Sequence, residues 1–301
     1  MPARSVVDTA RARTLRWIAI SSVILSVLAL SASSPDVDRW EQTAGPAGGA
    51  ISCVAVDIEN PDIIYAAVEQ AGIYRSVDAG HTWDMRYGGI GQWMADIVST
   101  PHGVFASYSH FGLLHSADQG QTWQTVVVAP ERRIMGVHYS VHGDVLLAKT
   151  EWGLLYASHD GGRTWRDATG DLPHAEIMTM AVSGPQEYWV ASGRGEPNGL
   201  YHTIDGGRTW MLSPLHRIPN ACVRQMLVAD DDPNLILVGL HNIHNEGRPD
   251  KVSYSWISRD GGETWDFYWG GIRSGQRLVA AGAGSRRRAV RQQCEPPLRL
   301  L

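Results

Sequence analysis

The sequence is poor in cysteine, in phenylalanine and in positive charge. Its 301 residues include three cysteines, Cys53, Cys222 and Cys294, which are too few and too widely spaced for a disulfide framework or a zinc motif. We expect Cys53 and Cys222 to be small apolar residues of inner strands. The formal net charge of −5 argues against a general nucleic-acid-binding surface. The composition therefore indicates no metal, no cofactor and no nucleic-acid partner.

Long apolar runs are scarce as well. One run, residues 17–30, follows a segment with four arginines and precedes the small residues 31–34. A positive segment, an apolar run of this length and small residues at its end are typical of a secretory signal, and the run is short for a transmembrane helix. We predict that residues 1–34 are a signal peptide and that the protein is secreted or extracytoplasmic. The alternative is an uncleaved membrane anchor formed by residues 17–32.

Tryptophan is abundant by contrast, with 12 residues against three phenylalanines. Five of the tryptophans end a repeated pattern, Ser/Thr-x-Asp-x-Gly-x-Thr-Trp, which we call the box. The five boxes are residues 76–83, 116–123, 158–165, 203–210 and 258–265. Their aspartates follow one another at intervals of 40 to 55 residues, which is the period of a propeller or solenoid array.

The segments between the boxes favour a propeller. They are short, rich in β-branched and aromatic residues and broken by turn residues, as at 51–56, 63–68 and 72–76, and they lack a sustained helical period. Three short strands followed by a strand that begins at the tryptophan make one four-stranded antiparallel blade. We predict an all-β propeller with five box-bearing blades, part of an incomplete ring of six or seven. The blades are expected at about residues 51–88, 89–128, 133–169, 175–214 and 221–270.

Each residue type of the box suits a tight hairpin between the third and fourth strands. The aspartate can accept bonds from backbone N–H groups a few residues later. The glycine two positions on permits a positive φ, and the tryptophan can bury roughly 150–250 Å² between neighbouring sheets. We therefore assign a structural role to the five box aspartates, which are Asp78, Asp118, Asp160, Asp205 and Asp260.

This pattern resembles the Asp-box of bacterial neuraminidase (BNR) repeats, and the resemblance covers about residues 40–270. The same box is found in sialidases, sortilin-type ectodomains, xyloglucan-cleaving endoglucanases and propeller assembly factors of photosystem II. The resemblance implies a β-propeller fold. It implies no single activity, because enzymes and non-enzymes share the box.

The two ends of the repeat region differ from its middle. Residues 40–43, Trp-Glu-Gln-Thr, are similar to the outer strand that follows each box, and we predict that they supply a strand that closes the ring. The propeller domain is thus expected at residues 35–276. Residues 277–280 could begin a sixth blade, but residues 277–301 are rich in arginine and have no box. We interpret them as an irregular basic tail, truncated or frame-shifted.

Binding sites of propellers usually gather at the blade ends opposite the box hairpins. Loops expected there carry the arginines, carboxylates and aromatic rings that bind glycans or polypeptides. The candidates are Trp93, Arg133, Glu151, Trp152, Arg194, Arg217 and His241. The insertion at residues 240–251 holds two further potential metal ligands beside His241, and we interpret it as a solvated loop.

Two local similarities bear on catalysis. Residues 67–75 are similar to the segment of xyloglucan-cleaving endoglucanases that carries a catalytic carboxylate, and Glu69 stands at that position. Residues 217–219, Arg-Ile-Pro, resemble a sialidase motif but lie between the fourth and fifth boxes instead of before the first. A glycosidase needs two carboxyl groups that flank the bond, and the sequence identifies no partner for Glu69. We predict an exported, non-catalytic module that binds a protein or glycan partner, with a sialidase-like or xyloglucanase-like glycoside hydrolase as the alternative.

Overall fold

The computed structural model describes residues 45–88, 94–108, 112–130, 132–173, 175–193, 199–217, 221–242, 253–268, 277–279 and 290–292. These residues belong to one compact unit, Ala44–Leu301. Across these ranges the protein is all-β, and the only helical element is a 3-10 turn, η1 (Pro214–Arg217). No helix in this part of the chain is long and apolar enough to cross a membrane, and residues 17–30 lie outside it.

Twenty strands form five four-stranded antiparallel sheets, each with its strands in chain order. Blade 1 holds β1 (Ile51–Val56), β2 (Ile64–Val68), β3 (Gly72–Ser76) and β4 (Asp84–Gly88). Blade 2 holds β5 (Met94–Thr100), β6 (Gly103–Tyr108), β7 (Gly112–Ser116) and β8 (Gln124–Val126). Blade 3 holds β9 (Ile134–Ser140), β10 (Val145–Thr150), β11 (Leu155–Ser158) and β12 (Arg166–Asp167). Blade 4 holds β13 (Ile177–Gly184), β14 (Glu187–Ser192), β15 (Gly199–Thr203) and β16 (Met211–Leu212). Blade 5 holds β17 (Ala221–Ala229), β18 (Asp232–Asn242), β19 (Ser253–Ser258) and β20 (Asp266–Tyr268). The predicted four-stranded blades are confirmed.

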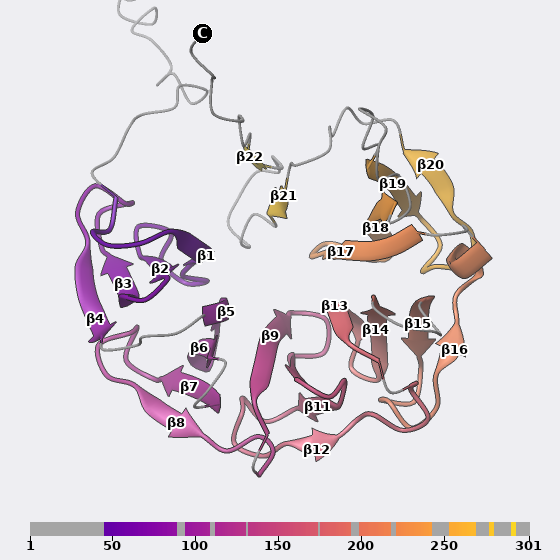
Figure 1. Ribbon diagram of the computed structural model, residues 1–301, viewed down its shortest axis with the longest axis horizontal. Coiled ribbons are helices and arrows are strands. Elements are labelled where there is room, and N and C mark those ends of the chain that lie inside the picture. Colours follow the sequence, from indigo (N-terminus) through magenta and orange to yellow (C-terminus); the bar gives the residue numbers. More distant parts are fainter. Residues whose placement is uncertain are drawn as a thin grey trace, which may run out of the picture. The chain divides into compact units, whose positions relative to one another are not determined.

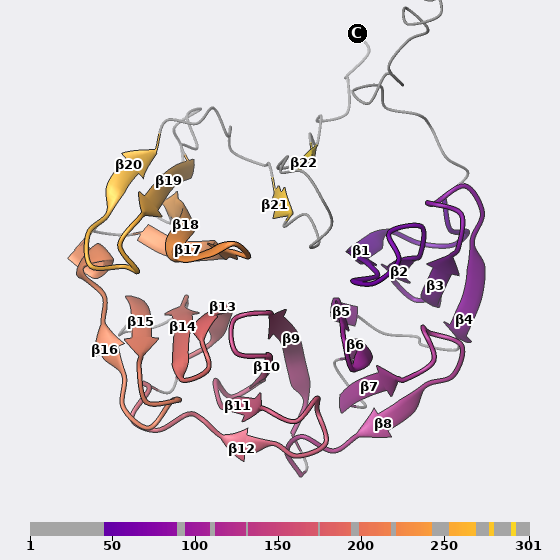
Figure 2. The same ribbon diagram turned by 180° about the vertical axis from the view of Figure 1, so that it is seen from behind.

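Neighbouring blades meet through their first strands. β1 packs beside β5, β5 beside β9, β9 beside β13 and β13 beside β17, so the first strand of each blade is the inner one and the fourth is the outer one (Figure 1; Figure 2 gives the view from behind). Two three-residue strands follow blade 5, β21 (Arg277–Val279) and β22 (Val290–Gln292). They pair with each other, and β21 packs beside β17.

The hydrophobic core lies between neighbouring blades. The second strand of each blade carries one large side chain in the position that pairs with the residue just before the box. In blades 1 to 4 these side chains are Tyr65, Phe105, Leu147 and Trp189, each at most 1% exposed. Their apolar clusters join each blade to the next one. The corresponding residue of blade 5, Leu237, is only half-buried.

Every box closes its hairpin with the same set of hydrogen bonds. In the third box, Thr164 donates from its backbone N–H and its hydroxyl to the Asp160 carboxylate, at 2.9 and 2.6 Å. The Ser158 hydroxyl donates to the same carboxylate at 2.8 Å and accepts the Gly162 N–H at 2.9 Å. The other four boxes repeat this arrangement. Each box aspartate therefore stabilises the turn of its own hairpin.

Removal of one box carboxylate should therefore cost stability. Asp160→Ala leaves the Thr164 N–H and two hydroxyls without their acceptor, and we expect the free energy of unfolding to fall by roughly 1–3 kcal/mol. Asp160→Asn keeps one side-chain oxygen and should lose less. Denaturant titration of both variants measures the difference. An Asp160→Ala variant as stable as the wild type would contradict the structural role.

The same bonds predict a loss of stability in acid. Hydrogen bonds from the threonine that precedes the tryptophan of each box hold the pKa of Asp78, Asp118, Asp160 and Asp260 at about 2, below the usual value of 3.8. Because the folded pKa is the lower one, the unfolded chain takes up more protons as the pH falls. The stability that the ionised box aspartates contribute is thus fully present above about pH 4 and is lost as the pH falls toward about 2. Denaturant midpoints across this range should drop less steeply in Asp160→Asn, and a flat profile for the wild type would contradict the prediction.

Candidate functional site

Antiparallel pairing determines which loops share a face. The box hairpins lie at one end of the blades. The turns between second and third strands and the connections between blades lie at the other end, which we call the loop face. The sequence predicted the binding residues on the loop face.

A cavity of about 650 Å³ opens on the loop face between blades 2 and 3. Its walls come from the connection between β8 and β9 and from the turn after β10, and residues 126–130 make much of its apolar lining. Arg133 and Glu151 meet at this cavity, where Nε of the arginine lies 3.6 Å from Oε2 of the glutamate. The Glu151 N–H also donates to the carbonyl oxygen of Arg133 at 3.2 Å. The site thus combines an apolar wall with a loose ion pair that a ligand can engage.

Trp152 follows Glu151 in the same turn and is 62% exposed. The Gly153 N–H donates to the carbonyl oxygen of Thr150 at 3.2 Å and closes the turn. A Cβ added at Gly153 would overlap the carbonyl oxygen of Ala175, so the turn is packed against the connection to blade 4. An exposed indole on a fixed turn, next to a glutamate that pairs with an arginine, has the composition of a binding hot spot.

Lys149, two residues before Glu151, has a different role. Its Nζ donates to the carbonyl oxygens of Ile177 and Met178 in β13, at 3.0 and 2.8 Å. Burial lowers the pKa of Lys149, while the charges of Asp96 and Glu176 act in the opposite direction. The ammonium group therefore links blade 3 to blade 4 through these hydrogen bonds, and its role is structural.

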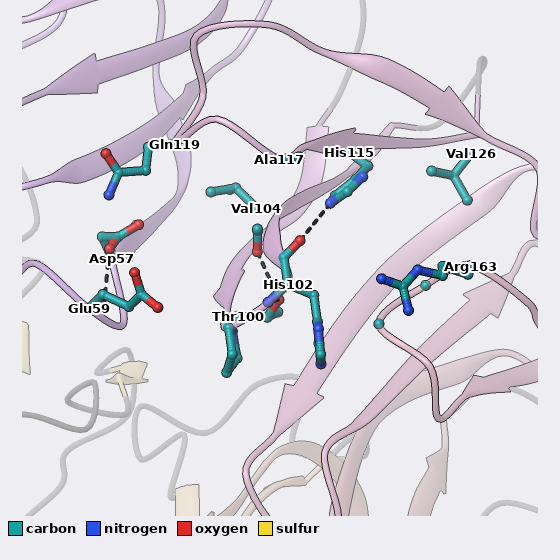
Figure 3. A pocket seen from close by; sticks show the side chains of 14 residues that line it. Asp57, Glu59, Thr100, His102, Val104, His115, Ala117, Gln119, Val126 and Arg163 are labelled. Atoms are coloured by element: carbon teal, nitrogen blue, oxygen red, sulfur yellow. Dashed lines mark hydrogen bonds between the residues drawn. The ribbon is translucent and has the colours of Figure 1, made fainter.

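A second cavity, of about 610 Å³, opens among the loops at the box end of blades 1 to 3. Figure 3 shows its polar side chains, among them Glu59, His102, His115, Gln119 and Arg163. Nε2 of His102 lies 2.7 Å from the Asp144 carboxylate, and the His115 ring N–H donates to the carbonyl oxygen of His102 at 2.9 Å. The first contact links blade 2 to blade 3, and the second lies within blade 2. No sequence pattern predicted this cavity, because its walls come from three blades.

The remaining predicted ligand residues are only partly covered by the structure. Trp93 and Arg194 lie outside the described residues. Arg217 ends η1 and His241 lies in β18, and the structure describes only the backbone of these two residues. The structure therefore brings Arg133 and Glu151 together, and Trp152 lies next to Glu151 in the same turn.

Glu69, the candidate catalytic acid, lies half-buried in the turn between β2 and β3. Its N–H donates to the carbonyl oxygen of Ala50 at 2.9 Å, and Gln70 beside it has a φ of 62°. A Cβ added at Gly49 would lie 2.5 Å from the carbonyl oxygen of Glu69. The segment before β1 is thus packed closely on this turn, which is also on the loop face.

The described residues hold no group of three or more histidine, cysteine or carboxylate side chains arranged for a metal ion. Residues 243–251 of the insertion lie outside that search. Cys53 is half-buried in β1 and packs against the core between blades 1 and 2.

The boxes have a counterpart among known families. The family model for the BNR/Asp-box repeat matches residues 256–267, which contain the whole fifth box and the beginning of β20. Together with the five box-bearing sheets, this match defines the protein as a β-propeller of Asp-box repeats.

Solved structures of two kinds share this fold. An ancestral GH74 enzyme superposes with a TM-score of 0.61 at 16% identity, covering 78% of this chain and 33% of that one. A structure of Ycf48 bound to a D1 peptide superposes with a TM-score of 0.58 at 16% identity, covering 81% of this chain and 76% of that one. At such identities the likeness establishes the fold alone.

Curated relatives fall into the same two kinds. A probable oligoxyloglucan-reducing end-specific xyloglucanase of Neosartorya fischeri is 30% identical over 145 residues, which are 48% of this chain and 16% of that protein. The photosystem II assembly lipoprotein Ycf48 of Synechococcus sp. is 37% identical over 60 residues, which are 19% of this chain and 17% of that protein. The chain matches less than a fifth of the length of either relative.

Proposed function

We propose that this propeller is a non-catalytic module that binds a polypeptide partner at the loop-face cavity between blades 2 and 3. The observation that carries the proposal is a cavity lined by Arg133, Glu151 and the apolar residues 126–130, with the exposed Trp152 in the same turn as Glu151. An apolar anchor site beside a charged pair suits a peptide, whose side chains and backbone need both. A Ycf48 propeller of similar fold has been solved with a peptide bound, which supports the proposal.

Trp152→Ala should weaken binding by about tenfold or more, because an exposed indole at a hot spot contributes at least about 1.4 kcal/mol. The readout is binding of the folded protein to an array of synthetic peptides, followed by titration of the peptides retained. Stability should stay within about 0.5 kcal/mol of the wild type, since the side chain is exposed.

Ile204→Ala is the matched control for this experiment. Ile204 is 60% exposed, close to the 62% of Trp152, but lies on the box hairpin of blade 4. Its removal should leave peptide affinity unchanged. Equal losses in the two variants, or a folded wild type that retains no peptide, would contradict the proposal.

The second candidate function is glycoside hydrolysis. It is favoured by the 30% identity to a xyloglucanase over 145 residues. Xyloglucan, mixed β-glucans and sialosides are the substrates to assay, with Glu69→Gln as the control. Sugar release that Glu69→Gln abolishes would establish an enzyme and displace the binding proposal. No release from a folded sample would remove this candidate.

We also propose that the protein acts outside the cytoplasm, on the strength of the signal-like residues 1–34. Mass spectrometry of the mature protein decides between cleavage near residue 34 and retention of residues 17–32 as an anchor. A cytoplasmic protein with an intact N-terminus would contradict export.

A further inference from the structure

The cavity at the box end of blades 1 to 3, which we call the box-end cavity, is lined by two charged side chains of opposite sign. They are Glu59, in the turn between β1 and β2, and Arg163, in the third box. Neither side chain forms a hydrogen bond or an ion pair with any residue that the structure describes. Figure 3 shows the carboxylate and the guanidinium group directed toward His102 from opposite sides. One wall of the cavity thus offers a negative charge and the facing wall a positive one.

Arg163 differs from the residues at the same position of other boxes. His81, Gln121 and Arg208 fold back and donate to the carbonyl oxygen of their own box aspartate, at 2.6, 3.2 and 3.4 Å. Within the described part of the chain Arg163 makes no such bond, and its side chain lines the cavity instead. Its guanidinium group is therefore available to a ligand.

The part of the cavity between the two charges is held firmly by the fold. The His102 N–H donates to the Thr100 hydroxyl at 3.0 Å, and Nε2 of the same ring lies 2.7 Å from the Asp144 carboxylate. A Cβ added at Gly161 would lie 2.5 Å from the His102 ring, so the box that carries Arg163 packs directly on that ring. A wall fixed in this way lowers the ordering cost of binding.

The wall formed by blade 1 is acidic. Asp57 is 8% exposed, and its carboxylate accepts the N–H groups of Glu59 and Asn60 at 3.1 and 3.0 Å. It also accepts the Tyr65 hydroxyl at 2.9 Å, so this carboxylate is occupied by the fold's own donors. The bonds fix the turn that presents Glu59. An ammonium group at this wall is attracted by two carboxylates, whereas an anion is repelled by both.

We propose that the box-end cavity binds a small zwitterion, either an amino acid or a short free peptide. Its carboxylate pairs with Arg163, whose guanidinium group can donate two parallel hydrogen bonds to a carboxylate, and its ammonium group pairs with Glu59. The volume of about 610 Å³ is typical of small-molecule sites, and Val104 and Ala117 add apolar surface for a small side chain. This site goes beyond the polypeptide binding proposed for the loop face.

Blocked peptides test the two charges separately. Calorimetric titration of the full chain at low salt uses dialanine and trialanine as probes, and we expect at least one of them to bind. N-acetylation or C-terminal amidation of that peptide should weaken binding by about tenfold or more, because each removes one charge-assisted hydrogen bond. The proposal is overturned if the folded wild type binds neither peptide at millimolar concentration, or if it binds the doubly blocked peptide equally well.

Charge-neutral variants assign the two contacts. Arg163→Gln should weaken binding of the free peptide by about tenfold or more but leave binding of the amidated peptide nearly unchanged, because that peptide lacks the carboxylate. Glu59→Gln should show the corresponding pattern with the acetylated peptide. Both side chains are exposed, so the thermal midpoints should stay within about 2 °C of the wild type.

Arg208→Gln is the matched control. Arg208 has the same position in the fourth box, but it bonds to its own box and does not line the cavity. This variant should bind the free peptide as tightly as the wild type. Equal losses in Arg163→Gln and Arg208→Gln would overturn the proposal, as would a loss in Arg163→Gln that is the same for free and amidated peptides.

Discussion

Gly262→Ala is expected to lower the free energy of unfolding by roughly 2–5 kcal/mol. Gly262, in the fifth box, has a φ of 91°, where an alanine costs about 1–2 kcal/mol in backbone strain. Its added methyl would also overlap Cη2 of Trp189 and lie 2.6 Å from Cζ2 of the same ring. Overpacking of this kind costs about 1–3 kcal/mol more. The variant therefore measures how tightly the box of blade 5 is packed against blade 4.

Gly112→Ala separates the two costs. Gly112 has a similar φ of 96°, but the nearest atom to an added methyl is the carbonyl oxygen of Val126 at 3.8 Å. This variant should show only the backbone strain, about 1–2 kcal/mol. Denaturant unfolding of the two variants gives the contribution of the contact as a difference. Equal losses would mean that Gly262 is needed for its φ alone.

Trp189→Ala is expected to cost about 3–5 kcal/mol, the usual loss for a buried tryptophan. Trp189 is 1% exposed, stacks on His202 at 4.0 Å and meets Trp265 edge-on at 6.1 Å. Its ring N–H donates to the Ser183 hydroxyl at 3.1 Å. Truncation would empty the core between blades 4 and 5 and leave that hydroxyl without its donor. Thermal or denaturant unfolding measures the loss, and a loss below about 1 kcal/mol would contradict the interblade core.

Trp189→Leu is the informative companion, because blade 3 has Leu147 at the same position. It should cost less than Trp189→Ala. Since the smaller side chain makes room for the methyl of Gly262→Ala, the double variant should be more stable than the sum of the single losses indicates. Strict additivity would show that Gly262 and Trp189 do not share a contact.

Much of the fold could be predicted from the sequence, because its strongest signals are local. Asp160, Gly162 and Thr164 are within one turn, so their spacing alone indicates the hairpin that they close. The tryptophan at the end of each box directly precedes an outer strand, and the distances between boxes indicate the size of a blade. Four-stranded blades follow from these short-range rules.

The contacts between blades could not be predicted in the same way. Phe105 and the glycine at 162 are far apart in the sequence, and the residue that meets each box glycine varies from blade to blade. The His102–Asp144 pair is another such contact and belongs to no repeated pattern. Such pairings depend on how one blade lies on the next, which no local pattern contains.

The candidate site shows both situations. Arg133, Glu151 and Trp152 were predicted singly, because each lies in a loop and has a side chain suited to binding. The meeting of Arg133 and Glu151 at one cavity depends on the connection between β8 and β9 lying against the turn after β10. This packing of one loop on another could not be predicted from the sequence.

The central claim is that the box end of the blades maintains the fold while the loop face binds a partner. Asp160→Ala and Trp152→Ala, measured side by side for stability and for peptide affinity of the folded fraction, test it most directly. The account predicts that Asp160→Ala loses roughly 1–3 kcal/mol of stability and keeps its affinity, and that Trp152→Ala keeps its stability and binds about tenfold more weakly. Loss of binding without loss of stability in Asp160→Ala would contradict it.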